Sequence, residues 1–228
     1  MSDLANRYFE VLGRIESAAT QAARNLSDIT LVIVTKNHSA ELPLELLELG
    51  ASDFGENRDQ EAAPKAKEVN ELSSKNPTWH FIGQLQTNKV KSVLEYASFL
   101  HSLDRESLLV ELEKRVVNRP SSLGVFIQVN LTEDPARGGI LPENLADFAD
   151  RVAKSQGLKL MGLMGVAGLG VAPERDFEKM ASFSEALKRN HPEATGLSIG
   201  MSGDFESAIG FGATHLRIGT AITGNRPG

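Results

Sequence analysis

The chain has 228 residues, of which 41% are hydrophobic and 24% are charged, a composition typical of globular proteins rather than disordered or fibrous ones. Its net charge of -6, without long basic runs, argues against a nucleic acid or an acidic membrane surface as partner. The absence of cysteine excludes disulfides, thiolate metal sites and cysteine nucleophiles, and it favours a reducing compartment.

The N-terminal segment predicts an amphipathic helix rather than a targeting sequence. Leu4, Tyr8, Val11 and Ile15 recur at helical spacing, with acidic residues between them. The longest uncharged stretch of apolar residues and glycine, 160–172, is shorter than the roughly 18 residues that a membrane span needs. We therefore expect a cytoplasmic protein without a membrane segment.

Short apolar runs rich in β-branched residues then alternate with segments of helical periodicity. The helical segments include 42–49, 108–116, 145–152 and 177–187. Asp104 is a candidate N-cap, and Pro142 and Pro173 suit the first turns of helices. The expected strands are 29–35, 51–55, 79–84, 98–103, 124–130, 158–166, 196–201 and 214–220.

This alternation has the size and rhythm of a compact (β/α)8 barrel. A doubly wound open sheet is the alternative, but it usually carries a G-x-G-x-x-G turn after its first strand. Here that strand ends in TKNHS at 35–39, without this fingerprint. We expect the α/β class, with residues 1–228 forming a single TIM-barrel domain that carries an extra N-terminal helix.

In such a barrel, polar side chains at the carboxyl ends of the strands line the active face. Lys36 directly follows the apolar run 31–35, and desolvation at the mouth of a barrel can supply the neutral amine that forms a Schiff base. Taken alone, however, such a lysine is more often a solvated residue at a strand end. The other polar residues at these positions are Asn57, His80, Gln84, His101, Asp104, Asn130, Ser202 and Arg217.

The ends of the last two expected strands predict a phosphate site. Ser202 and Gly203 precede a helix, so their backbone N–H groups can point at an anion, and Gly219 and Thr220 follow the eighth strand. Glycines that serve only tight turns are the alternative. Asp204 argues against phosphate unless its carboxylate points away.

Arg217 lies within an apolar run, where a guanidinium cannot stay unpaired. It could form an internal ion pair with Asp53 or Glu56, or it could contact a ligand. Together with Lys36 and the two loops it suits a phosphorylated aldehyde cofactor whose ring nitrogen faces the guanidinium.

The five histidines show none of the spacings of a metal site, such as H-x-H or H-E-x-x-H. We expect His80 to be a hydrogen-bonded residue inside the barrel rather than a base. His101 could pair with Asp104, which is equally a candidate to cap the following helix.

Several segments together resemble the pyridoxal-phosphate homeostasis proteins, the YggS/PROSC-like family, from about residue 30 to 226. They are DFGENRDQE at 53–61, WHFIGQLQTNK at 79–89, HSLD at 101–104, GLMG at 162–165, LSIGMSGD at 197–204 and RIGTAI at 217–222. The resemblance implies a fold similar to the N-terminal barrel of bacterial alanine racemase and binding of pyridoxal 5'-phosphate.

Residue by residue, the resemblance implies that Lys36 forms the Schiff base and that Arg217 faces the pyridine nitrogen. It makes Ser202, Gly219 and Thr220 phosphate contacts, with Asn57 and Met201 lining the cofactor. The sequence departs from the family pattern just after Lys36. Arg137-Gly-Gly also stands where members often carry lysine, which argues against a second cofactor-accepting lysine there.

The function implied is a carrier of pyridoxal 5'-phosphate in vitamin B6 and amino-acid homeostasis, without evident turnover. Apoenzymes that use this cofactor are the expected partners, and a monomer or weak dimer is the expected assembly. A weak racemase is the first alternative, but it needs a second base, and the two tyrosines, Tyr8 and Tyr96, lie in helical segments. A lyase that uses the Lys36 amine directly and a purely protein-binding barrel are the others.

Overall fold

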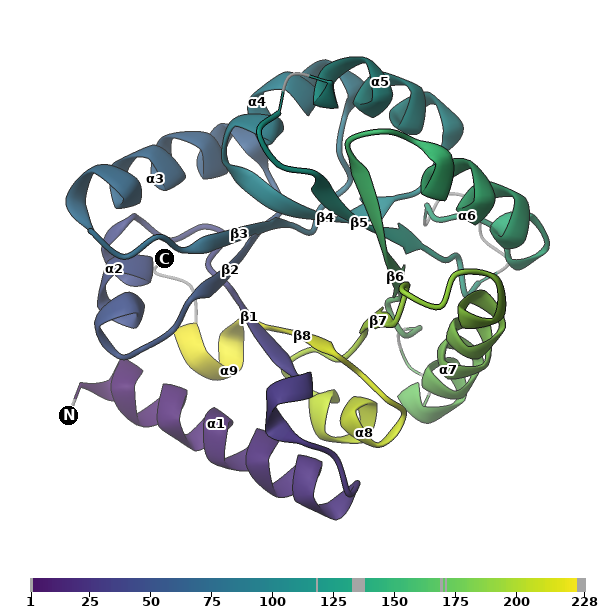
Figure 1. The fold of residues 1–228 in the computed structure, drawn as a ribbon. Helices are drawn as coiled ribbons and strands as arrows, with labels where there is room; N and C mark the ends of the chain where they lie inside the picture. The colour runs from purple at the N-terminus through teal and green to yellow at the C-terminus, as the bar shows by residue number, and fades with distance from the viewer. Residues whose placement is uncertain (1, 118, 133–137, 169, 171, 225–228) are drawn as a thin grey trace.

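The computed structural model describes residues 2–117, 119–132, 138–168, 170 and 172–224. Its strands form a closed barrel in which each pairs in parallel with the next along the chain and β8 pairs with β1 (Figure 1). The expected TIM-barrel fold is confirmed. The strands are β1 (Thr30–Val34), β2 (Asp53–Glu56), β3 (Thr78–Phe81), β4 (Ala97–Leu103), β5 (Leu123–Gln128), β6 (Leu158–Met164), β7 (Gly196–Ser198) and β8 (His215–Ile218).

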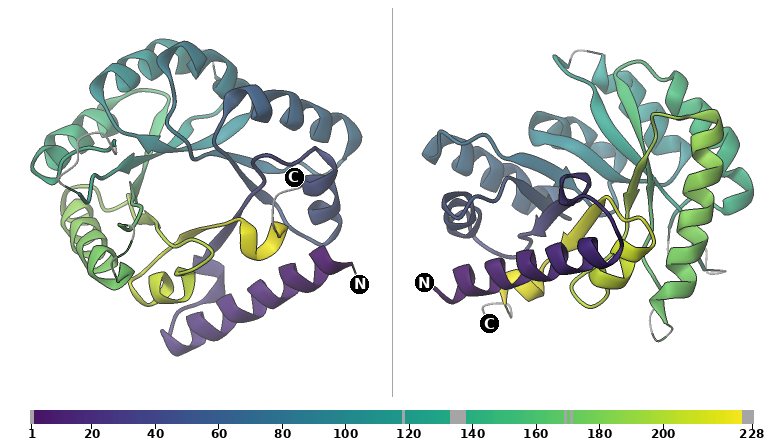
Figure 2. Two further views of the ribbon diagram at one scale, coloured as in Figure 1. Left: turned by 180° about the vertical axis from the view of Figure 1, so that it is seen from behind. Right: turned by 60° about the horizontal axis from the view of Figure 1, so that its bottom comes forward.

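Helices surround this barrel (Figures 1 and 2). They are α1 (Asp3–Gln21), α2 (Glu41–Glu48), α3 (Asp59–Leu72), α4 (Val90–Tyr96), α5 (Glu106–Val116), α6 (Leu145–Lys154), α7 (Pro173–Asn190), α8 (Phe205–Gly210) and α9 (Thr220–Thr223). Short 3-10 turns are η1 (Leu26–Asp28), η2 (Thr87–Lys89) and η4 (Pro142–Asn144). Pro142 and Pro173 occupy the first turns that we expected for them.

One cap prediction is wrong. The residue before α5 is Arg105, and no side chain caps this helix through a hydrogen bond. The Asp104 carboxylate instead accepts a bond of 2.6 Å from the Arg105 guanidinium. The Asp104 carboxylate is therefore paired with the charged Arg105 guanidinium instead of accepting from the backbone N–H groups at the start of α5.

The extra N-terminal helix is confirmed, and it packs against α8 and α9 (Figures 1 and 2). Its apolar stripe, which includes Leu4, Tyr8, Val11 and Ile15, is buried against the barrel. Arg7 Nε donates to Ile222 O at 2.8 Å, which ties α1 to α9. The helix therefore supports the region where β8 returns to β1.

Side chains alternate between the two faces of the barrel wall. The outward ones join the helices in a continuous hydrophobic core, whereas aromatic and polar rings fill the interior: His80, Phe99, His101, Phe126 and His215. Gly162, with φ of +145°, allows a close approach of β6 to β7, since a Cβ there would lie 1.8 Å from Gly196 O. The strands are thus closely spaced around a partly polar centre.

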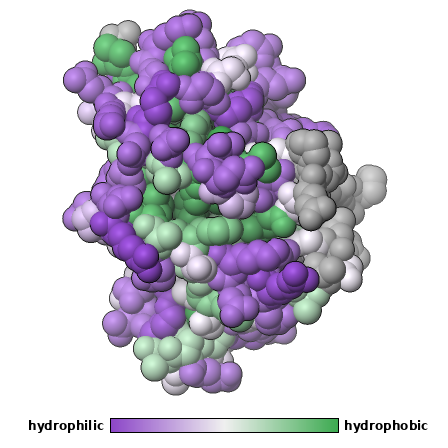
Figure 3. Space-filling model, turned by 90° about the vertical axis from the view of Figure 1, so that its right-hand side faces the viewer, coloured by the Kyte–Doolittle hydropathy of each residue, from purple (hydrophilic) through white to green (hydrophobic). Residues whose placement is uncertain are grey.

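On the side that Figure 3 shows, hydrophilic residues predominate over the outer surface, and hydrophobic ones gather in a band across the middle. The hydrophilic outer surface is expected of amphipathic helices that turn their apolar stripes inward. No described helix combines the length and apolar character that crossing a bilayer requires.

Candidate functional site

The residues proposed from the sequence follow neighbouring strands at the carboxyl end of the barrel. β1 lies between β8 and β2, with Val32 opposite Arg217 and Val34 opposite Gly55. A Cβ on Gly219 would lie 3.6 Å from Val34 O, so the loop after β8 passes beside the end of β1. Lys36 stands two residues beyond Val34. The fold therefore brings Lys36 to the same end of the barrel as the loops after β7 and β8.

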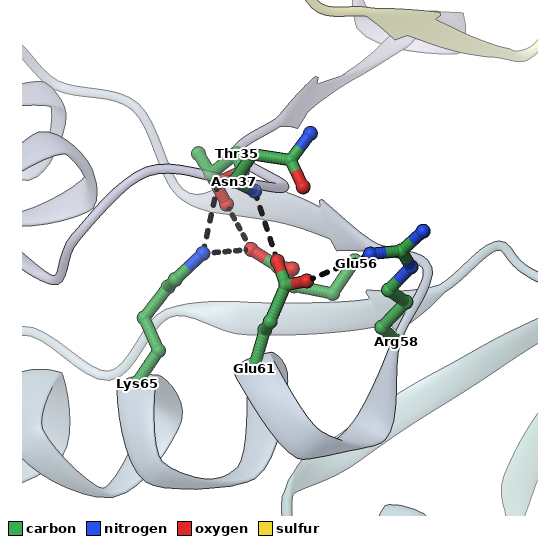
Figure 4. Close-up of polar contacts among 6 residues, drawn as sticks. All are labelled: Thr35, Asn37, Glu56, Arg58, Glu61 and Lys65. Carbon is green, nitrogen blue, oxygen red and sulfur yellow. Dashed lines mark hydrogen bonds and ion pairs between the residues drawn. The ribbon is translucent and has the colours of Figure 1, made fainter. Parts of the chain in front are cut away.

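The residues on both sides of Lys36 are fixed by α3 and β2 (Figure 4). Thr35 Oγ1 donates to Glu56 Oε1 at 2.7 Å, and Thr35 O accepts from Lys65 Nζ at 2.8 Å. Asn37, with φ of +64°, donates its backbone N–H to Glu61 Oε2 at 3.1 Å. β1 ends at Val34, and Lys36 begins the turn that follows it, between two residues that are both held in place.

A buried ion pair lies at the centre of this support. Lys65 Nζ is 2.6 Å from Glu56 Oε1, and the two side chains are 5% and 0% exposed. Burial raises the pKa of Glu56, although Lys65 and Thr35 act in the opposite direction. Lys65 also stands four residues after Glu61, a spacing typical of exposed helical pairs. The sequence therefore offered no sign that Lys65 would be buried against Glu56.

The two loops proposed to hold phosphate come together at Ser202. Its Oγ accepts from the backbone N–H groups of Gly219 at 3.2 Å and Ala221 at 3.4 Å. Asp204 Oδ1 accepts from Met201 N at 2.6 Å, so this carboxylate binds its own loop. A Cβ on Gly203 would meet nothing within 4 Å, which leaves space beside Ser202.

Arg217 is buried and held by neutral acceptors. Nη1 donates to Ser198 O at 2.7 Å and to Ser198 Oγ at 2.6 Å, and Nη2 donates to Gly165 O at 2.9 Å. Burial lowers the pKa of Arg217 to about 10, with Asp204 opposing the shift, so the side chain stays charged at neutral pH. The expected alternative of an ion pair with Asp53 or Glu56 is wrong, because these carboxylates bind His80 and Lys65.

The remaining proposed residues surround the same region. Asn57 follows β2 and is half-buried, and its Oδ1 is a buried oxygen with no hydrogen-bond partner among the described residues. Met201 precedes Ser202 and is also half-buried, and Thr220 is exposed at the start of α9. An unpaired buried amide oxygen is costly unless a ligand or water satisfies it.

Inside the barrel, His80 forms hydrogen bonds as expected, to Asp53 at 2.9 Å and to His101 at 2.9 Å. The proposed pairing of His101 with Asp104 is wrong, since His101 binds His80 and Ser198 Oγ, the latter at 2.8 Å. Alternation explains the error, because His101 points to the barrel axis. The sequence did not reveal that Ser198 links the histidines to Arg217.

Three other strand-end residues lie beside hollows at this end of the barrel. Gln84 and Asp104 line one of about 410 Å³, and Asn130 lines one of about 240 Å³. Arg137 lies outside the described residues. These hollows show that the carboxyl end offers space beyond the loops after β7 and β8.

The donor set fits a phosphorylated pyridine aldehyde. Lysine is the side chain that condenses with an aldehyde, and loop N–H groups suit a phosphate that approaches the backbone closely. Three hydrogen bonds use three of the five N–H groups of Arg217, so among the described residues two remain for an acceptor such as a ring nitrogen.

Comparison with known proteins extends this picture to the whole chain. Residues 12–227 match the family model described as "Alanine racemase, N-terminal domain". The pyridoxal phosphate homeostasis protein of Escherichia coli is 37% identical, covering 99% of this chain and 98% of its own length. The protein of the same name from Mycobacterium leprae is 36% identical, over 98% of this chain and 93% of its own.

Among solved structures, PipY of Synechococcus elongatus with PLP bound superimposes with a TM-score of 0.80 at 32% identity, covering 92% of this chain and 99% of its own. The relatives are therefore similar in sequence and fold over nearly their full lengths. The chain belongs to the family of the pyridoxal phosphate homeostasis proteins, which is built on a barrel of the alanine racemase N-terminal type.

Proposed function

We propose that this protein binds pyridoxal 5'-phosphate as a Schiff base on Lys36 and serves vitamin B6 and amino-acid homeostasis without catalytic turnover. One observation carries the proposal: Lys36 after β1, the loops after β7 and β8 that meet at Ser202, and Arg217 near the end of β8 belong to neighbouring strands of the barrel. A relative at 32% identity has been solved with PLP bound, which supports the same ligand here.

Lys36 supplies the covalent attachment. Its neutral Nζ forms the C=N bond to the aldehyde carbon, and the aldehyde oxygen leaves as water with the two hydrogens of the amine. Lys65 Nζ donates to Thr35 O and Asn37 N–H donates to Glu61, so the backbone on either side of Lys36 is held in place. The chain thereby orients the lysine before the cofactor arrives.

The phosphate is held mainly by oriented neutral groups. Ser202 and Thr220 offer hydroxyls, and Gly219 offers a backbone N–H that the Ser202 oxygen accepts in this structure. Asn57 and Met201 line the cofactor, and the unpaired Asn57 Oδ1 is available to accept a hydrogen bond. The Asp204 carboxylate is bound to Met201 N, so it is turned away from the anion.

Arg217 faces the pyridine nitrogen. A guanidinium there keeps the nitrogen unprotonated, which weakens the cofactor as an electron sink. Tyr8 lies in α1 and Tyr96 in α4, outside the barrel, so neither of the two tyrosines serves as a second base. Carbanion chemistry is therefore poor, which favours a carrier over the alternative of a weak racemase.

The chain folds as a single domain, supported by one hydrophobic cluster that extends from Leu4 to Ile222. The cytoplasm, a monomer or weak dimer, and transfer of the cofactor to apoenzymes complete the proposal. Sedimentation at several concentrations measures the assembly, and activation of a purified apoenzyme by the loaded protein measures transfer.

The first experiment is spectroscopic. Mixed with pyridoxal 5'-phosphate, the wild type is expected to develop a visible absorbance band, and after borohydride reduction the mass increase maps to Lys36. Lys36→Ala loses the band while its circular dichroism is unchanged, because this half-buried side chain contributes little to the core. Lys91→Ala, which removes an exposed lysine of α4, is the control and keeps the band. A reduced adduct at another lysine in the wild type contradicts the assignment.

The second experiment tests the phosphate loops by titration. Ser202→Ala is expected to weaken binding by about tenfold to a hundredfold, because one hydrogen bond to a charged group contributes on the order of 1.5 to 3 kcal/mol. Gly219→Val weakens it more severely, since a branched side chain obstructs several backbone N–H groups. Pyridoxal without phosphate binds poorly to the wild type. Equal affinity for pyridoxal and its phosphate ester argues against this phosphate site.

The same preparations separate the alternatives. Interconversion of amino-acid enantiomers by the loaded protein favours the racemase. Cleavage of a sugar phosphate without added cofactor favours the lyase, and the absence of any cofactor band in the wild type favours a protein-binding barrel.

A further inference from the structure

A chain of hydrogen bonds crosses the barrel interior from Asp53 to Arg217. Asp53 Oδ1 is 2.9 Å from His80 Nε2, and His80 Nδ1 is 2.9 Å from His101 Nε2. His101 Nδ1 is 2.8 Å from Ser198 Oγ, which is 2.6 Å from Arg217 Nη1. These groups come from five strands, β2, β3, β4, β7 and β8, so only the closed barrel brings them together.

The groups at the two ends of this chain of hydrogen bonds determine which atom donates in each bond. Arginine can only donate, and an ionised carboxylate can only accept. The Ser198 hydroxyl therefore donates to His101 Nδ1, His101 Nε2–H donates to His80 Nδ1, and His80 Nε2–H donates to Asp53. Each link then holds one hydrogen, and both imidazoles are neutral with the hydrogen on Nε2.

The surroundings favour this arrangement. Burial works against ionisation of Asp53, but the bonds from His80 and Ser52 lower its pKa, so the acceptor end stays charged. Burial, together with His80, His215 and Arg217, lowers the pKa of His101 well below its usual value, so this ring stays neutral. The other groups that face the chain are His215 and the rings of Phe99 and Phe126, and Asp204 acts on the Arg217 end.

We propose that Ser198, His101 and His80 are positioning residues for Arg217, whose orientation they fix through this chain of donors ending at Asp53. The proposal rests on the function proposed above, in which Arg217 faces the cofactor ring. Because the Ser198 proton is committed to His101, the lone pairs of Oγ remain directed at the guanidinium. Arg217 is then held on one side by Ser198 and Gly165 O, with its other N–H groups available to the ring.

An added proton disrupts this order. If His80 gains a hydrogen on Nδ1, His101 must move its own hydrogen to Nδ1 and donate to Ser198 Oγ. That oxygen then receives donors from both His101 and Arg217, and the Ser198 hydroxyl loses its acceptor. Asp53 is 20% exposed, so this is the end of the chain that protons from solvent can reach.

The first test uses the free wild-type protein. Nitrogen-15 NMR of the imidazoles, assigned with His80→Gln and His101→Gln, is expected to show the Nε2–H tautomer for both rings at neutral pH. The Nδ1–H tautomer in either ring overturns the proposal. This measurement is made without cofactor, so its outcome does not depend on whether the protein binds one.

The second test removes the link next to Arg217. In Ser198→Ala the Arg217 Nη1 resonance is expected to shift, because Nη1 loses its acceptor Oγ, while the bonds to Ser198 O and Gly165 O remain. Affinity for pyridoxal 5'-phosphate is expected to fall by about tenfold, while borohydride still traps the cofactor on Lys36. Unchanged resonances and unchanged affinity overturn the proposal.

The third test uses a matched pair of carboxylates. Asp53 and Asp150 each bind a histidine Nε2, at 2.9 and 2.8 Å, but Asp150 does so on the surface with His191. Asp53→Asn is expected to alter the pH dependence of the bound-cofactor absorbance, and Asp150→Asn is expected to leave it unchanged. Equal pH profiles in the two variants contradict the proposed role of Asp53 at the end of the chain of hydrogen bonds. A wild type that binds no cofactor contradicts the proposed function. The two NMR measurements then still show whether the proposed chain of hydrogen bonds exists.

Discussion

At the scale of single residues, the support of Lys36 depends on a pair of buried charges. Taking two charges out of water is expensive, so an ion pair with 5% and 0% exposed side chains persists only when further hydrogen bonds satisfy it. Thr35 supplies two of them, through its hydroxyl to Glu56 Oε1 and its carbonyl oxygen to Lys65, whereas Glu56 Oε2 has no hydrogen-bond partner among the described residues. The same bonds fix the backbone next to the proposed cofactor lysine. Stability and function therefore depend on the same contacts.

We expect Lys65→Met to lower the free energy of unfolding by about 3 kcal/mol at pH 7, because it leaves the Glu56 carboxylate buried without its cation. The pKa of Glu56 is already raised by burial and rises further in the variant. The folded variant therefore binds a proton more readily than the unfolded chain, so the deficit shrinks as pH falls from 7 to 5. Urea unfolding at both pH values measures this.

The control for that experiment is Lys67→Met. The Lys67 side chain is 78% exposed, and its Nζ lies 3.8 Å from Oε1 of the exposed Glu71. We expect it to change stability by less than about 0.5 kcal/mol. A deficit for Lys65→Met as small as that of the control, or one that grows in acid, contradicts the role assigned to the buried pair.

At the scale of elements, α1 stabilises the closing segment of the barrel. Arg24, three residues after the end of α1, donates to the carbonyl oxygens of Ile209 in α8 and Ala213 just before β8, and Arg7 of α1 donates to Ile222 in α9. α9 has only four residues, too few to hold itself in place, so its position depends on this contact. Because α9 begins at Thr220, the N-terminal helix indirectly positions a proposed phosphate contact.

We therefore expect Arg7→Ala to weaken pyridoxal 5'-phosphate binding by roughly threefold to tenfold, since it removes a charge-assisted bond to α9. The Lys36 adduct should still form at saturating cofactor. Fluorescence titration measures the affinity, and Arg189→Ala, at an exposed position of α7, is the control. Identical affinities for the two variants would show that α1 does not influence the loops.

At the scale of the whole molecule, the barrel has a polar and aromatic interior that is sensitive to acid. Burial and the neighbouring His80 lower the pKa of His215 to about 4, although Asp53 opposes the shift. The half-buried ring packs on Phe126 at 4.8 Å and on His101 at 5.8 Å between centroids. A proton there would place a charge in the centre of the barrel.

The folded molecule should therefore lose stability in acid. Because the pKa of His215 lies below its usual 6.5 only in the folded state, the unfolded chain binds more protons between pH 6.5 and about 4. Stability contributed by neutral His215 is present above this window and is lost as pH falls through it, by roughly 2 kcal/mol between pH 7 and 5. Urea unfolding at the two pH values measures the loss.

His215→Phe keeps an aromatic ring in place and is expected to reduce this loss, whereas His191→Gln on the surface is expected to leave it unchanged. His101 contributes in the same direction, so part of the loss remains in the variant. An equal loss in the wild type and His215→Phe contradicts the assignment to His215.

The sequence by itself determined the repeating architecture and the positions of the ligand-binding candidates. Short apolar runs rich in β-branched residues alternate with helical segments, and a parallel strand usually returns through a helix, so this local pattern permits few folds. Lys36, Ser202, Arg217 and Gly219 stand at strand ends, which the topology of a barrel brings to one face. These residues could be found from their positions relative to the predicted strands alone.

Only the tertiary structure decided which polar groups meet inside the molecule. Lys65 finds Glu56 rather than Glu61, and Ser198 joins His101 to Arg217 across strands more than 90 residues apart in sequence. Asp104 binds Arg105 instead of capping α5, and Asp204 turns back to Met201. A hydrogen bond between side chains forms only when the two atoms are placed to within a few tenths of an ångström and the side chains point towards each other. Local periodicity carries no information on either quantity, because both are set only when the eighth strand closes on the first.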